Sequence, residues 1–169
     1  MTSTGTDYFR ESYLEALRSA ESLSTSLPRL RPDYGPEEIQ AIDQETKDRL
    51  DAFSLRFIRL QDAMGRNLFR ALLGAELEDT ADLTQLDLLH RMEKRGIVTG
   101  VDDWALLRRL RNLLTHEYPD DPAKQADILN EAIRSAPLLL DTLRAVGRYA
   151  RERLGMSDLP ETTLTLPSP

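Results

Sequence analysis

The chain has 169 residues, the size of one domain, and it can bury an apolar core without a disulfide or a structural metal. It contains no cysteine and only two histidines, which excludes disulfide scaffolds, thiolate metal sites and cysteine nucleophiles and disfavours a multi-histidine metal centre. The formal net charge of −7 argues against a protein that coats nucleic acid over a large surface, but it allows a local basic site.

Two long helices are predicted in the first half of the chain. Apolar residues at three-to-four spacing predict an amphipathic helix over residues 7–27. Prolines end it and indicate a linker over residues 28–35. A second helix is expected over residues 36–74, because proline and two glutamates suit its first turn and an apolar stripe follows. We expect Gly65, inside this helix, to mark a close contact with another helix.

Two shorter helices are expected next. The aspartate or threonine at residues 79–80 is a good N-cap for the first, and Gly96, followed by an isoleucine, is typical of a helix C-cap. The second is expected to begin at the aspartates of residues 102–103 and to carry Trp104 in the core or at a dimer interface. It ends before Pro119, since a residue that precedes proline is disfavoured in a helix.

The last predicted helix covers residues 121–155 and keeps a four-three apolar rhythm throughout. Pro137 lies inside it and is expected to kink or split it. Residues 156–169 contain three prolines and no apolar pattern, so an extended or disordered tail is expected there.

Five helices without a convincing strand predict an all-α fold, namely an antiparallel four-helix bundle with an additional N-terminal helix. The expected divisions are an N-terminal helix and proline-containing linker at 1–35, the helical bundle at 36–155 and the tail at 156–169. The N-terminal helix is expected to be an arm that packs on the bundle or on a partner. The N-terminus lacks a signal sequence and no apolar run approaches the roughly 20 residues of a membrane span, so we expect a cytoplasmic protein without membrane contact.

The end of the fourth predicted helix carries a polar motif formed by Arg111, Asn112, His116 and Tyr118. Arginine, four residues, histidine, any residue and tyrosine is the mark of the HepT branch of the HEPN superfamily, which this segment resembles. The likeness extends over roughly residues 40–154. It implies a helical dimer, a metal-independent RNA endonuclease with a composite site at the dimer interface, and the role of toxin in a bacterial toxin–antitoxin pair.

Helix geometry indicates that one protomer does not complete such a site. Arg111 and His116 are five residues apart, about 140° around a helix. Two copies packed antiparallel across a two-fold axis can bring both side chains into one cleft. We therefore expect a homodimer.

The residue types suit cleavage of RNA without a metal or other cofactor, because the 2′-hydroxyl is the nucleophile. Arg111 is expected to hold the scissile phosphate and its developing charge. His116, placed in the last helical turn where the helix dipole favours imidazolium, is expected to be the general acid and base. Asn112 is expected to support the site by hydrogen bonding, and Arg108 and Arg109 to guide the RNA backbone.

Tyr118 has a separate expected role. In the HepT branch a partner nucleotidyltransferase antitoxin, which uses ATP, adenylylates the tyrosine of this motif and silences the nuclease. By resemblance, Tyr118 is the acceptor here. New negative charge beside Arg111 would occupy the phosphate-binding groups and repel RNA.

Other interpretations of these residues are open. His116 and Tyr118 can be a helix-end histidine and an interface tyrosine with capping roles only, and Arg108 and Arg109 can be solvated or paired with neighbouring acidic residues. The alternative function is a non-catalytic helical partner of a nucleotidyltransferase that binds a nucleotide or substrate. A third possibility is a purely structural interaction bundle.

Overall fold

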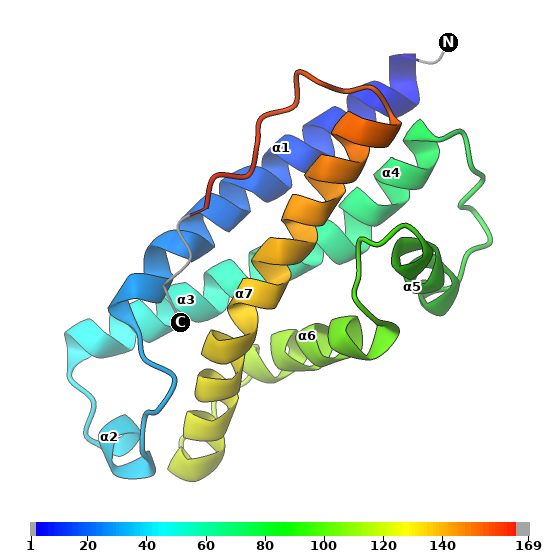
Figure 1. The fold of residues 1–169 in the computed structure, drawn as a ribbon. Helices are drawn as coiled ribbons and strands as arrows, with labels where there is room; N and C mark the ends of the chain where they lie inside the picture. Colours follow the sequence, from blue (N-terminus) through cyan, green and yellow to red (C-terminus); the bar gives the residue numbers. More distant parts are fainter. Residues whose placement is uncertain (1–2, 165–169) are drawn as a thin grey trace.

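The computed structural model describes residues 3–164, which contain helices and turns and no strand (Figure 1). Within that range no helix combines the length and apolar character needed to cross a bilayer. In chain order the helical elements are α1 (Ser3–Ser26), a short 3₁₀ turn (Leu27–Arg29), α2 (Pro36–Gln40), α3 (Gln44–Asp62), a π-helical segment (Ala63–Leu68), α4 (Phe69–Ala75), α5 (Gln85–Lys94), α6 (Val101–Leu114) and α7 (Pro122–Arg153). The all-α prediction is confirmed.

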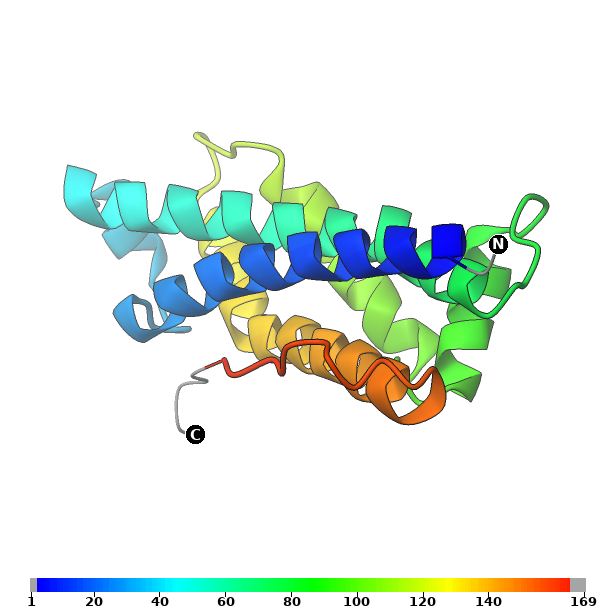
Figure 2. The ribbon, with the colours of Figure 1, turned by 90° about the horizontal axis from the view of Figure 1, so that it is seen from above.

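Helix α1 packs against α3, α4 and α7 through one face and leaves its other face exposed. It runs antiparallel to the α3–α4 rod, and from above it lies between that rod and α7 (Figure 2). Its apolar stripe, which includes Phe9, Tyr13, Ala20 and Leu23, is fully buried. One continuous core joins these residues with those of α3 to α7, so of the two expected positions for this helix, on the bundle or on a partner, it packs on the bundle.

The expected helix over residues 36–74 is interrupted twice. The chain leaves helical geometry after Gln40, and Asp43 starts α3 as its N-cap by accepting a hydrogen bond from the Thr46 N–H at 2.8 Å. The second interruption is the π-helical segment, where Gly65 faces α6. A side-chain carbon at Gly65 would lie 3.2 Å from the Trp104 ring, so the expected close contact is confirmed.

The two shorter helices differ from the prediction at their starts. Helix α5 begins at Gln85, capped by Thr84 and Asp87 in a reciprocal capping box, instead of at residues 79–80. Its C-terminus matches the prediction: Gly96 has a φ of 69°, and the N–H of the following isoleucine returns to Met92 O at 3.0 Å. Helix α6 starts with Val101, one residue before the expected aspartates.

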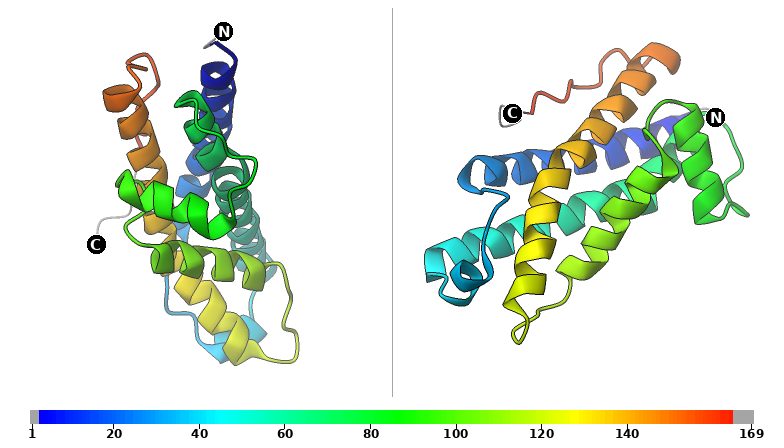
Figure 3. Two further views of the ribbon diagram at one scale, coloured as in Figure 1. Left: turned by 90° about the vertical axis from the view of Figure 1, so that its right-hand side faces the viewer. Right: turned by 60° about the horizontal axis from the view of Figure 1, so that its bottom comes forward.

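Helix α7 is continuous through Pro137. Asp121 caps its first turn by accepting from the Lys124 N–H at 3.0 Å, as the Asp-Pro start predicts. The axis changes direction near the middle of the helix without a break (Figure 3), so Pro137 bends the helix and does not split it.

Residues 156–164 form an extended strap along α1 and α7 (Figure 1). The Tyr13 hydroxyl donates to Pro160 O at 3.0 Å, and Arg144 donates to Leu164 O at 2.7 Å. Arg10 pairs with Asp158 at 2.7 Å and lowers the pKa of that carboxyl. Of the two expected states of the tail, residues 156–164 show the extended one, and these contacts hold them against α1 and α7. Residues 165–169 lie outside the described range.

Leu77 is a strained position in the loop after α4. Its φ is 62°, a left-handed conformation that disfavours any side chain, and its side chain is 75% exposed. The turn is a helix C-cap, with Glu78 N–H bonded to Leu73 O at 2.9 Å, where glycine is the preferred residue. The leucine therefore costs backbone energy without burying its side chain in return.

We predict that Leu77→Gly stabilises the protein by about 1 kcal/mol, seen in urea unfolding and as a rise in Tm of about 2–4 °C. The control is Leu77→Ala, which removes the exposed side chain but keeps the strained φ, and it should give no gain. Equal stability of the glycine and alanine variants would contradict the assignment of strain.

Candidate functional site: the C-terminal end of helix α6

Helix α6 is held in place by its apolar face and by two ion pairs, Arg111 with Asp62 of α3 and the more exposed Arg109 with Glu131 of α7. Trp104, Leu107 and Leu110 are fully buried, and the Trp104 ring packs against Phe69 with their centroids 4.7 Å apart. Trp104 is therefore a core residue. This packing aligns α6 across α3 and the N-terminal half of α7 (Figure 3) and fixes where the motif residues emerge.

Arg111, which directly follows the buried Leu110, is clamped by Asp62. Its Nε and Nη2 donate to the two carboxylate oxygens of Asp62, each at 2.8 Å, in a two-pronged ion pair. Both side chains are about three-quarters buried, at 21% and 26% exposure. The hydrogen bond to Asp62 raises the pKa of Arg111, so the guanidinium is charged at every accessible pH.

The clamp lies in a hollow of about 300 Å³ between the end of α3, the π-helical segment and α6. We call it the arginine hollow; four arginines and one aspartate line it, leaving three positive charges in excess. Arg66 and Arg108 are exposed at its rim, and Arg66 Nε is 3.8 Å from Asp62. Arg70 is committed to the backbone oxygens of Thr80 and Leu83.

Asn112 lies inside the arginine hollow, whereas Arg109 lies outside it. Asn112 lines the arginine hollow, and its Oδ1 accepts from Arg111 Nη1 at 3.4 Å, a long hydrogen bond. Arg109 is outside the hollow and pairs with Glu131 at 3.3 Å. Of the two arginines expected to guide RNA, only Arg108 is therefore beside Arg111, and within residues 3–164 no carboxylate pairs with it.

His116 lies beyond the end of α6, and its expected place in the last helical turn is wrong. The helix ends at Leu114 with Thr115 as C-cap, and His116 follows in a tight turn in which its N–H bonds to Leu113 O at 3.2 Å. Pro119 explains the early end, because a proline ring clashes with the carbonyl four residues before it, here that of Thr115. The His116 imidazole therefore does not occupy the last turn of a helix, where the helix dipole was expected to act on it.

His116 and Tyr118 line a second, larger hollow of about 690 Å³, which we call the histidine groove. Its walls are mainly apolar and come from α2 and the residues after it, α3, the end of α6 and the start of α7, including Ile39, Leu50, Leu55, Leu114 and Ile128. His116 is exposed and its side chain has no hydrogen-bond partner in the described part of the chain. Lys124 Nζ lies 4.4 Å from the centre of the Tyr118 ring, a cation–π contact.

The motif residues are thus divided between two places within one chain. Arg111, Asn112 and Arg108 line the arginine hollow, whereas His116 and Tyr118 line the histidine groove. The structure also supplies a residue that the motif did not indicate, Asp62, because nothing in the sequence pairs a position on α3 with one 49 residues later. Among residues 3–164 no group of three or more histidines or carboxylates is arranged to hold a metal ion.

The chain matches no protein-family model, no curated protein and no solved structure.

We predict that Asp62→Asn frees Arg111 and destabilises the fold by about 1 kcal/mol, since the pair is mostly buried but not sealed from water. The Arg111 Nε–H NMR signal should lose its downfield shift and protection from exchange, and urea unfolding should give the free-energy change.

Arg66→Gln is the matched control, because Arg66 contacts the same carboxylate only at 3.8 Å and is 72% exposed. It should leave both measurements close to wild type. An unchanged Arg111 signal in Asp62→Asn would show that the carboxylate does not orient the guanidinium.

Proposed function

We propose that this protein is a metal-independent RNA endonuclease of the HEPN type, active as a homodimer and acting as the toxin of a bacterial toxin–antitoxin pair. The observation that carries the proposal is the end of α6, where an oriented arginine and an exposed histidine without a partner occur in the spacing of the HepT motif. In this proposal the 2′-hydroxyl of RNA attacks the adjacent phosphate, so no metal is needed to generate the nucleophile.

Arg111 is suited to hold the scissile phosphate through its remaining edge. Two of its nitrogens are engaged by Asp62, while Nη1 has only the long contact to Asn112 at 3.4 Å. A phosphate oxygen can replace that weak contact with a charge-assisted hydrogen bond. Arg66 and Arg108 at the rim add the positive charge that attracts the backbone.

His116 is suited to proton transfer because its ring is exposed and its nitrogens are not engaged by the described residues. In the proposed reaction it takes the proton of the 2′-hydroxyl and returns one to the departing 5′-oxygen. Within one chain it lies in a different hollow from Arg111. The proposal therefore requires a second copy, whose Arg111 meets this His116.

The histidine groove provides an apolar surface for that second copy. Leu55, on its wall, has 47% of its surface exposed, which is unfavourable for a large apolar side chain in water. Covering the groove with the same face of another protomer would bury Leu55 beside His116 and join the two half-sites. We expect a second copy of this chain to cover the groove, because one chain alone does not bring Arg111 and His116 together.

Tyr118 is the proposed acceptor of the adenylyl group that a nucleotidyltransferase antitoxin transfers from ATP. It lies in the same groove wall as His116, so an attached nucleotide would block access to the histidine. Lys124, already 4.4 Å from the ring, would attract the added phosphate and hold it over the site.

The clamp on Arg111 favours one alternative, a non-catalytic helical subunit that binds a nucleotide or substrate for a nucleotidyltransferase. An arginine paired by two hydrogen bonds stabilises developing charge less than a free one does, while the rim arginines still bind phosphate. Binding without cleavage would support this second function.

We predict that the purified protein cuts single-stranded RNA in EDTA and that His116→Ala and Arg111→Ala each abolish cleavage without unfolding the helices. Refolding the two inactive variants together should restore about a quarter of the activity. Half of the dimers then contain one of each variant, and each of these has one intact site out of two.

The mixing experiment separates a shared site from one within a single chain. No activity after mixing, although mixed dimers form, would place Arg111 and His116 of one chain in the same site and overturn the composite geometry. Full activity of His116→Ala alone would remove the histidine from the mechanism.

We further predict that Leu55→Arg yields a monomer by analytical ultracentrifugation and loses cleavage, because a charge cannot be buried in the apolar groove without a partner. Leu86→Arg is the control, since Leu86 is similarly exposed, at 54%, but lies on α5 outside the groove. A Leu55→Arg dimer with full activity would exclude this face as the interface.

A further inference from the structure

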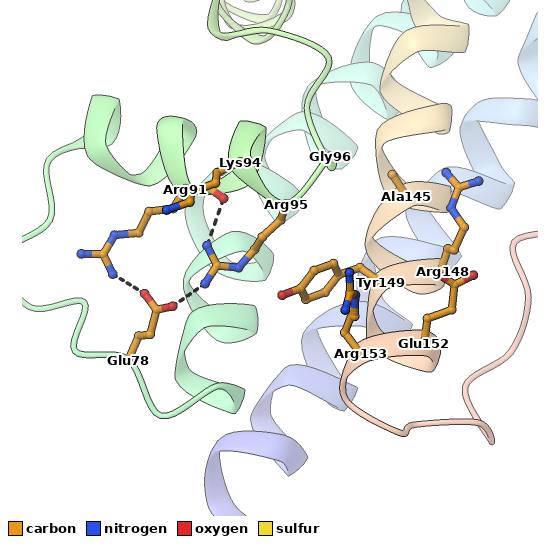
Figure 4. A pocket seen from close by; sticks show the side chains of 10 residues that line it. All are labelled: Glu78, Arg91, Lys94, Arg95, Gly96, Ala145, Arg148, Tyr149, Glu152 and Arg153. Carbon is orange, nitrogen blue, oxygen red and sulfur yellow. Dashed lines mark hydrogen bonds and ion pairs between the residues drawn. The ribbon is translucent and has the colours of Figure 1, made fainter.

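A separate cationic hollow lies between the C-terminal ends of α5 and α7 (Figure 4). It has a volume of about 660 Å³ and is near the start of α6, whereas His116 follows the end of that helix. Five of the residues that line it are basic, in a chain whose net charge is −7: Arg91, Lys94, Arg95, Arg148 and Arg153. Nothing in the proposed nuclease uses them.

One side of the hollow is a rigid framework. Arg95, 14% exposed, donates to Glu76 at 2.8 Å and also pairs with Glu78, which pairs in turn with Arg91. Tyr149 points toward Arg95 from α7 (Figure 4) and donates its hydroxyl proton to Glu76 at 2.5 Å. Burial and this hydrogen bond raise the pKa of Tyr149, so its hydroxyl is neutral.

The other basic side chains are free. Within residues 3–164 no carboxylate pairs with Lys94, Arg148 or Arg153, and all three are exposed. The carboxylates of Glu76 and Glu78 are already used by the framework, which leaves Glu152 as the one lining acid that is not engaged.

The helix dipole accounts for part of this arrangement. Lys94 and Arg153 are in the last turns of α5 and α7, where cations are favoured, and each helix end adds about half a negative charge. Arg148 lies before the last turn of α7, and the dipole does not explain its presence. The dipoles also do not explain why the C-terminal ends of α5 and α7 face the same hollow, because their negative partial charges repel each other.

We propose that this hollow binds a small ligand that carries two or more linked phosphate groups. The three free cations come from two helices, and Figure 4 shows the Arg148 guanidinium directed away from Lys94 and Arg95, so they suit a ligand whose linked phosphates each meet a different cation. The planar donor forks of Arg148 and Arg153 match phosphate oxygens. The framework of Arg95, Glu76 and Tyr149 keeps the two helix ends at a fixed separation, so little ordering is needed on binding. The hollow is within the size range of small-molecule sites.

Titration calorimetry with inorganic triphosphate, at physiological ionic strength, tests the proposal. We expect saturable binding of one triphosphate per chain. The double variant Arg148→Gln/Arg153→Gln should bind at least tenfold more weakly, which corresponds to the loss of about one charge-assisted hydrogen bond. Glu152→Gln, which removes the unengaged acid, should strengthen binding. Circular dichroism checks that each variant folds.

Arg18→Gln/Arg59→Gln is the matched control, because these two arginines of α1 and α3 are also exposed and also lack an ion pair among the described residues. It should bind triphosphate as wild type does. So should Arg66→Gln/Arg108→Gln, which removes the rim charges of the arginine hollow and therefore separates this site from the proposed nuclease. Absence of saturable binding at millimolar triphosphate, or an equal loss in the control pair, would overturn the proposal. If the Arg148→Gln/Arg153→Gln variant lost affinity for single-stranded RNA while wild type bound no triphosphate, the hollow would belong to an RNA path instead.

Discussion

The packing of Trp104 against the π-helical segment determines where helix α6 lies, and the candidate site depends on it. The ring packs closely on glycine at residue 65, where a side-chain carbon would lie 3.2 Å from the indole, closer than an ordinary van der Waals contact, so the ring would have to shift slightly. The Asp62–Arg111 pair joins the same two elements through polar groups. The interior therefore anchors the start of α6, and an ion pair at its edge orients the arginine near its end. The indole Nε1 has no hydrogen-bond partner in the described part of the chain, a cost that the surrounding apolar contacts must offset.

Much of the fold could be predicted from the spacing of apolar residues. The stripe through Leu50, Phe53 and Phe57 is buried as expected, because only one face of a helix can meet the core. The break after Gln40 was not predicted, because local capping by Asp43 competes with continuation of the helix and leaves no trace in the apolar pattern. Nor does periodicity show which helices pack against α1, since α1 has the same kind of stripe as its neighbours.

The candidate site was predictable in its residues but less so in its arrangement. Arg111 and His116 were found from their spacing, which assumed that the helix continues through His116. The Pro119 ring prevents this, and the turn that results carries His116 and Tyr118 into a groove made by other helices. Asp62 was not predictable at all, because contacts between distant helices depend on the packing angle and not on any local pattern.

In the proposed nuclease, a clamped Arg111 is compatible with RNA binding if other arginines attract the RNA and Arg111 orients its phosphate. A guanidinium that is three-quarters buried needs an acidic partner, and Asp62 is that partner. The Arg111–Asp62 pair as a whole then has no net charge. The hollow nonetheless keeps three positive charges in excess, because Arg66 and Arg108 at the rim have no comparable clamp and Arg70 bonds only to backbone oxygens. Long-range attraction for a phosphate backbone then comes from the rim, where side chains are flexible and charges are exposed to salt. Asp62 fixes the orientation of the Arg111 guanidinium, so its Nη1 edge would donate to one phosphate in one orientation. A second protomer would then need to deliver only the imidazole of His116, an exposed side chain outside the helix and free to adapt its position.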